Sequence, residues 1–182
     1  MSAAAAEAAT GPGRILVAGI GNVFFGDDGF GVEVVRRLAA APVPRGVEIR
    51  DIGIRGVHLA FELLDGVAKL ILVDAAARGE APGTVSLVEI DRDDPGPAGD
   101  AVSLDPHGFG PGTVLALIDS ISAGADIGRV LLVTCEPLTI EPRIGLSEPV
   151  RAAVDDAVRL VCELCYPDDA HADGAERVQD AD

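Results

Sequence analysis

Short, continuous apolar runs separated by helix-like segments constrain the fold of this chain more than any other feature. The runs at residues 14–20, 69–75 and 129–136 are apolar at consecutive positions rather than at alternate ones. Strands of that kind are buried on both faces, which is typical of parallel sheets covered by helices on either side. The sequence therefore predicts a single three-layer α/β domain with a mostly parallel, twisted sheet of about five strands.

The other expected elements follow from helical spacing and from alternation. Helices are expected over residues 29–40, 58–64, 113–121 and 147–165, and further strands over 47–52 and 84–90. The strand at 84–90 alternates, so we expect it to be half-exposed, at an edge or antiparallel. The last helix has Ser147 as its expected N-cap and Pro149 in its first turn. Its expected buried face consists of Val150, Val154, Val158, Val161 and Cys165.

Length and composition limit the domain organisation. The chain has 182 residues, of which 48% are hydrophobic, which suffices for one well-buried domain. The ends are rich in Ala, Gly and Pro or in acidic residues, and poor in large apolar ones. We therefore expect a domain over residues 14–166 between disordered tails at 1–13 and 167–182.

The charge balance and the cysteine count exclude several classes of protein. There are 14 Lys and Arg against 30 Asp and Glu, and the formal charge of −16 argues against a nucleic-acid backbone or an anionic membrane surface as partner. No uncharged apolar run approaches the roughly 18 residues of a spanning helix, and the first residues lack the pattern of a signal peptide. Three cysteines, an odd number, fit a reducing compartment. We expect a cytoplasmic protein.

The segment GIGNVFFGDDGFG, residues 19–31, begins like the phosphate-binding turn of a dinucleotide fold. Phe24 stands where the third glycine of that motif would permit close packing. Asp27 and Asp28 would place negative charge beside a pyrophosphate that needs a positive helix end. Dinucleotide binding is therefore disfavoured. A strand-turn-helix with a purely structural role is disfavoured to about the same extent.

Acidic and basic side chains follow the ends of several expected strands. Asp27 and Asp28 follow the first strand, Asp74 ends the third, and His107 lies in the long loop at residues 91–112. In an open parallel sheet, ligands bind outside the carboxyl ends of the strands, and these loops would meet at one rim. Two carboxylates and an imidazole form an ordinary ligand set for nickel or zinc.

Each of these residues also has a structural interpretation. Asp27 or Asp28 can cap the helix that begins near Gly29, Asp74 can stabilise a strand end, and His107 can be a surface residue. Between the two neighbouring acids we prefer Asp27 for capping or support and Asp28 for the metal, and the alternative in which Asp27 is the first-loop ligand stays open.

Several motifs occur in an order that resembles the hydrogenase maturation protease family. They are GIGNVFFGDDGFG, LILVDA with Asp74, APGTV, DPH with His107, and CEPLTIEPRIGLSEPV. The resemblance runs from about residue 14 to residue 165. It implies a phosphorylase/hydrolase-like α/β domain and an aspartic-type endopeptidase by family classification. Such an enzyme removes the C-terminal extension of a nickel-iron hydrogenase large-subunit precursor after nickel insertion.

The resemblance also implies that Asp28, Asp74 and His107 contact nickel brought by the precursor, with no organic cofactor. Many relatives have a serine or threonine near the histidine, whereas Asp105 and Pro106 precede His107 here, and Asp105 is a candidate to orient the imidazole. Nickel then serves as a recognition handle or also as a Lewis acid, and a general-base role for Asp28 or Asp74 stays open. The alternative function is a metal-dependent binding module or chaperone that does not cut the precursor.

Other candidate residues are assigned mainly to packing. Cys135 is a possible nucleophile with His107 as base, but is expected to fill core space. Cys162 and Cys165 have CxxC spacing at the end of a helix, where a thiolate is not stabilised. His58 is expected to be structural or near the substrate surface. Residues 145–147 lack the pattern of a nucleophile elbow, and no serine-protease triad is apparent.

Overall fold

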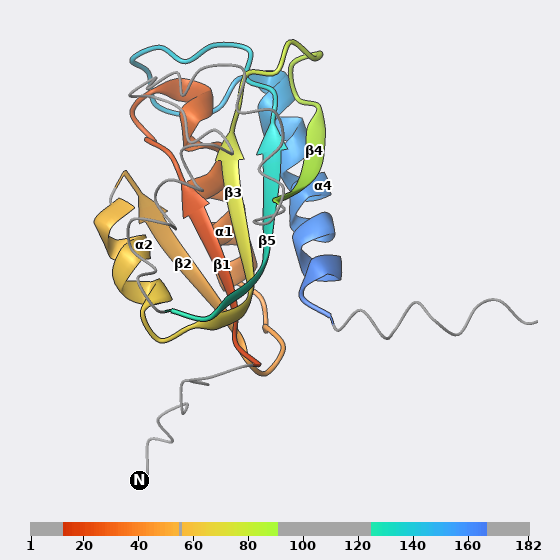
Figure 1. Cartoon of the computed structure of the whole chain (residues 1–182). Coiled ribbons are helices and arrows are strands. Elements are labelled where there is room, and N and C mark those ends of the chain that lie inside the picture. The colour runs from red at the N-terminus through yellow and green to blue at the C-terminus, as the bar shows by residue number, and fades with distance from the viewer. Residues whose placement is uncertain (1–12, 55, 91–124, 167–182) are drawn as a thin grey trace, which may run out of the picture.

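A five-stranded sheet forms the centre of the molecule (Figure 1). The computed structural model describes residues 13–54, 56–90 and 125–166. In spatial order the strands are β2 (Val47–Gly53), β1 (Ile15–Ile20), β3 (Val67–Ala75), β5 (Ile127–Cys135) and β4 (Val85–Ile90). Neighbouring strands are parallel except β4, which pairs antiparallel with β5 at the edge. The mostly parallel sheet and the antiparallel edge strand are confirmed.

Helices cover both faces of the sheet because successive strand residues point to opposite sides. The helices are α1 (Phe30–Ala39), α2 (Gly56–Leu63) and α4 (Glu148–Leu164), and a short 3₁₀ helix, η1 (Gly26–Gly29), precedes α1. Val17 and Ile71 belong to the core shared with α1 and α4, whereas Leu16 and Leu70 belong to a second core that includes Leu59 of α2. The predicted three-layer arrangement is therefore confirmed (Figure 1).

The closing helix is α4, which matches the predicted segment but begins differently in detail. Val150, Val154, Val161 and Cys165 are buried and Val158 is half-buried, so the apolar face is confirmed. Ser147 occupies the N-cap position, yet its side chain forms no capping hydrogen bond with the helix. Its hydroxyl donates to Asp27 instead, at 2.8 Å, so the predicted capping role of that side chain is wrong.

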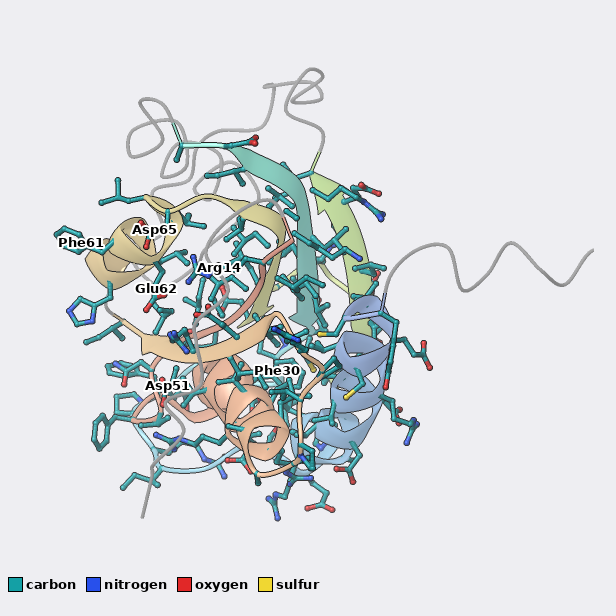
Figure 2. All side chains as sticks on the ribbon, turned by 90° about the horizontal axis from the view of Figure 1, so that it is seen from below. Arg14, Phe30, Asp51, Phe61, Glu62 and Asp65 are labelled. Carbon is teal, nitrogen blue, oxygen red and sulfur yellow. The ribbon has the colours of Figure 1, made fainter. Side chains whose placement is uncertain are left out.

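An ion network joins β1, β2 and α2 near the amino end of the sheet. Arg14 is 4% exposed and donates to both carboxylate oxygens of Glu48, at 3.1 Å each, and to Glu62 Oε2 at 2.8 Å. Arg50 bonds the same two glutamates, at 2.6 and 3.0 Å. Figure 2 shows Arg14 and Glu62 meeting between the sheet and α2. Two arginines and two glutamates thus form a closed, charge-balanced network.

Some predictions fall on other parts of the chain. The loop at 91–112 with Asp105 and His107, the helix expected at 113–121, and nearly all of both tails lie outside the described residues. The domain limits therefore stay a prediction. In the part of the chain that the structure describes, no helix has the length and apolarity needed to cross a membrane.

Candidate active site at the carboxyl edge of the sheet

The carboxyl ends of the parallel strands lie at one edge of the sheet, where ligands of such folds bind. Gly19 of β1 is opposite Val73 of β3, and Asp74 is opposite Thr134 of β5. The chain leaves β1 after Ile20 and returns as η1, which contains Asp28 and contacts β3. Asp28 and Asp74 are therefore brought to the same edge, whereas His107 lies outside the described residues.

Glycines allow η1 and α1 to press against the strand ends. A Cβ on Gly31 would lie 2.1 Å from the carbonyl oxygen of Val73, the residue before Asp74. A Cβ on Gly21, whose φ is +124°, would lie 1.8 Å from the carbonyl oxygen of Asp28. Only a residue without a side chain fits at either position. These glycines serve backbone packing around the two acids, which explains a motif that superficially resembles a phosphate loop.

Backbone N–H groups orient the two candidate ligands. Asp28 is 8% exposed, and its Oδ2 accepts the N–H of Asn22 at 2.6 Å. Asp74 is 1% exposed, and its Oδ1 accepts the N–H of Ala75 at 2.8 Å. The N-cap of α1 is Gly29, and no side chain caps either η1 or α1. The alternative in which Asp27 or Asp28 caps this helix is therefore wrong.

Asp27 is fully buried and holds a distant loop. Its Oδ1 accepts the N–H of Ser147 at 2.6 Å. Its Oδ2 accepts three hydrogen bonds, from the Ser147 hydroxyl at 2.8 Å and from the N–H groups of Leu138 and Thr139 at 2.9 and 3.1 Å. Burial alone would raise the pKa of Asp27, but these hydrogen bonds outweigh it and hold the pKa below its usual value. The support role predicted for Asp27 fits this geometry, although the element it supports is the loop at 137–147.

Backbone hydrogen bonds complete the connection between the two loops. Gly26 donates to the carbonyl of Arg143, and Arg143 donates to the carbonyl of Phe24, both at 2.9 Å. Sequence reasoning used the late segment CEPLTIEPRIGLSEPV only as a motif and missed this structural role. The only hint in the sequence was that this late segment and the GDDG segment occur in the same chain. That co-occurrence does not show that the two segments are in contact.

Sequence reasoning also missed Glu136, the acid that follows β5. It is 8% exposed, and its carboxylate accepts the N–H of Arg78 at 2.7 Å and the N–H of Gly79 at 3.3 Å. A signal was present, because Glu136 ends a continuous apolar run just as Asp74 does. The carboxyl edge therefore has more buried carboxylates than the predicted ligand set.

The cysteines and His58 can now be placed. Cys135 is fully buried, and burial first, then the charges of Asp27 and Glu136, raise the pKa of its thiol to about 12. A thiol that stays protonated at neutral pH is a poor nucleophile, which fits the packing role. Burial likewise raises the pKa of Cys165 to about 11, whereas Cys162 is exposed. His58 is exposed on α2, so its predicted place near the substrate surface stays a prediction.

Carboxylates at this edge suit a cation, but the described residues do not form a complete metal site. Among residues 13–54, 56–90 and 125–166, no group of three His, Cys, Asp or Glu residues is placed to hold a metal ion. A three-donor site that includes Asp28 and Asp74 therefore needs a donor from elsewhere, and His107 stays the predicted one.

Several known proteins with similar sequences or folds are hydrogenase maturation proteases. The model of the family "Hydrogenase maturation protease" matches residues 32–164. A putative hydrogenase maturation protease of Methanocaldococcus jannaschii is 34% identical over 151 residues, covering 81% of this chain and 93% of the relative. The hydrogenase 2 maturation protease of Escherichia coli is 33% identical over 169 residues, covering 92% and 99%.

Solved structures agree with these sequence matches. The hydrogenase maturating endopeptidase HybD from E. coli has a TM-score of 0.67 and 29% identity, with 83% of this chain and 91% of that chain covered. A hydrogenase 2 maturation peptidase from a Thaumarchaeota archaeon has a TM-score of 0.63 and 35% identity, covering 83% and 97%.

Proposed function

Because this chain belongs to the hydrogenase maturation protease family, we propose that it is an endopeptidase that removes the C-terminal extension from a nickel-iron hydrogenase large-subunit precursor after nickel insertion. The peptidase activity is supported by the names of its relatives. The substrate and the timing come from the resemblance described above.

The observation that carries the proposal is the placement of Asp28 and Asp74 at one edge of the sheet. In the proposed site these carboxylates and His107 contact the nickel of the precursor, which is part of the substrate. An N–H group fixes one oxygen of each carboxylate, at 2.6 Å for Asp28 and 2.8 Å for Asp74. Carboxylate and imidazole donors suit a borderline divalent metal.

Asp27 is not assigned as a ligand, because both of its oxygens accept hydrogen bonds from the loop at 137–147. Of the two neighbouring acids, Asp28 therefore remains the candidate for the metal. The bound nickel serves as a recognition handle, or also as a Lewis acid that polarises the scissile carbonyl. In either case the metal positions the neighbouring peptide bond.

Processing of nickel-loaded and nickel-free precursor, followed by intact mass, tests the proposal. We expect the wild-type protein to shorten only the loaded precursor. Asp28→Asn, Asp74→Asn and His107→Ala should each slow processing by about 100-fold or more, because positioned groups of this kind contribute that much. An exposed aspartate on another part of the surface, Asp65→Asn, serves as the matched control and should process at the wild-type rate.

Three results would contradict parts of the proposal. Full cleavage by all three variants would remove the site. A loaded precursor that binds but keeps its mass would favour the binding module or chaperone. Hydrolysis of casein by the pure protein would contradict the expectation that cleavage awaits a metal-loaded partner.

A further inference from the structure

Glu136 lies one residue beyond β5 and holds the segment that follows Asp74. We infer that Glu136 is a positioning residue, which fixes the path of the chain after β3 and thereby the place of the Asp74 carboxylate. This inference rests on the proposed function, because it concerns the same site. Nothing in the motif-based assignment of ligands gives Glu136 a role.

The carboxylate of Glu136 binds the segment after Asp74 through two backbone groups. Its Oε2 accepts the N–H of Arg78 at 2.7 Å, and its Oε1 accepts the N–H of Gly79 at 3.3 Å. The side chain is buried although Arg78 and Gly79 are exposed. Hydrogen bonds to an ionised carboxylate are among the stronger ones in proteins, so they fix a loop that would otherwise be solvated.

The backbone of Glu136 binds the same segment further along. Its N–H donates to the carbonyl of Thr84 at 2.9 Å, and its carbonyl accepts the N–H of Gly83 at 2.8 Å. The preceding residue, Cys135, accepts the N–H of Ala76 at 3.0 Å. Residues 76–84 are therefore held at both ends and in the middle by two consecutive residues of one strand end.

The start of α4 confines this segment from another side. A Cβ on Gly83, whose φ is +88°, would lie 2.6 Å from the carbonyl oxygen of Pro149. Gly79 also has a positive φ, of +82°. The chain after Asp74 thus has little freedom to shift, provided that Glu136 keeps its contacts.

Glu136 acts through the backbone and is not placed as a ligand. Both carboxylate oxygens accept N–H groups, and only 8% of the residue is exposed. Glutamine at this position would keep the volume and one acceptor oxygen, but its NH₂ group would oppose the second N–H. Alanine would leave both N–H groups without this acceptor. The two substitutions therefore remove one and then both of the acceptor oxygens that hold the segment after Asp74.

Steady-state processing of nickel-loaded precursor over a range of precursor concentrations, normalised to folded protein, tests this role. We expect kcat to fall about 10-fold in Glu136→Gln and about 100-fold in Glu136→Ala, with KM changed less than about two-fold, because small misplacements of a reacting group cost this much. Glu80→Gln is the matched control, an exposed glutamate of the same segment that accepts the Ser86 hydroxyl at 3.2 Å. It should process at the wild-type rate.

Amide hydrogen exchange on the wild-type protein adds a measurement that needs no variant. The N–H groups of Arg78 and Gly79 should exchange at least about ten-fold more slowly than in an unstructured peptide, and Glu136→Gln should reduce this protection. Unprotected N–H groups in the wild-type protein would overturn the inference, as would a Glu136→Gln variant with unchanged kcat and reduced stability. If Asp74→Asn cleaves at full rate, the proposed site itself fails first, whichever result Glu136→Gln gives.

Discussion

Acidic side chains lie at both ends of the sheet, half-buried at the amino end and buried at the carboxyl edge, and their partners differ between the two ends. Near the amino end, Glu48 and Glu62 are paired with Arg14 and Arg50 in a closed network. At the carboxyl edge, Asp27 and Glu136 accept hydrogen bonds from backbone N–H groups. Within the described part of the chain, no arginine or lysine forms an ion pair with Asp27 or Glu136.

This difference in hydrogen-bond partners indicates a structural role for the acids at the amino end and a functional role for those at the carboxyl edge. An arginine cancels the charge of its glutamate, so the amino-end network is neutral and suits a structural role. An N–H group satisfies a carboxylate without cancelling its charge, so the carboxyl edge stays negative. A negative, rigidly held edge suits a cation carried by a partner. Substitutions at the two ends of the sheet test this division.

Loss of Arg14 should produce the largest change in stability. Arg14→Ala removes a buried guanidinium and leaves the half-buried Glu48 and Glu62 with less compensation, and breaking a buried pair costs about 3 kcal/mol. Urea unfolding should show this loss, while the processing rate per folded molecule stays at the wild-type value. Arg36→Ala, which removes an exposed pair with Asp51, is the control and should cost less than about 1 kcal/mol. A similar loss in both variants would contradict the comparison.

Substitution of Asp27 should affect both stability and processing. Asp27→Asn replaces one acceptor oxygen by an NH₂ group that faces N–H donors, which should lower the free energy of unfolding by about 2 kcal/mol. Because Asp28 is the next residue, we also expect processing of loaded precursor to fall about ten-fold or more. Unfolding and processing assays on the same preparation measure both effects. An unchanged processing rate would show that the loop clamp is purely structural.

Acid should remove the contribution of Asp27. Its folded-state pKa is lower than the unfolded value of 3.8, so its stabilising effect is fully present above that value. The contribution is lost as the pH falls through 3.8 toward the lower folded-state pKa, where the carboxylate gains a proton. The difference in unfolding free energy between wild type and Asp27→Asn should therefore shrink in acid and stay constant from pH 6 to 8. A difference that grows in acid would contradict this assignment.

Cys135 should give the smallest effect. Burial, and then the charges of Asp27 and Glu136, raise the pKa of its thiol to about 12, so the thiol stays protonated at neutral pH. Cys135→Ala should lower stability by about 1 kcal/mol through a small cavity and leave processing within about two-fold of wild type. Peptide mapping after treatment of native protein with iodoacetamide should show modification of the exposed Cys162 and none of the buried Cys135. Loss of processing in Cys135→Ala would reopen the nucleophile alternative.

Much of the fold could be predicted because its determinants are local. Continuous apolar runs such as the one ending at Asp74 identify strands buried on both faces, and the alternation at residues 84–90 identifies the edge strand. The apolar spacing at 147–165 identifies α4 without reference to any other part of the chain. The parallel topology then predicts that Asp28 and Asp74 meet one edge, and they do.

The roles of individual polar residues could not be predicted in the same way. Ser147 has every local sign of an N-cap, and Asp27 has the local signs of one too, yet the two side chains bond each other across 120 residues of sequence. Glu136 bonds Arg78 over a separation of 58 residues. Local propensity indicates which roles suit a residue type at a given position, such as helix capping. It does not indicate which distant residue will be the hydrogen-bond partner in the folded chain.

The layers, the mostly parallel sheet and the edge at which chemistry is expected could all be read from the sequence, because the apolar pattern of each short segment shows whether a strand is buried on one face or on both. Which acid supports the scaffold, and which remains a candidate for the metal, follows from contacts that form only in the folded chain. The physical reason is that a buried carboxylate is assigned by its hydrogen-bond donors. Those donors come from loops that approach one another only when the sheet and helices have packed.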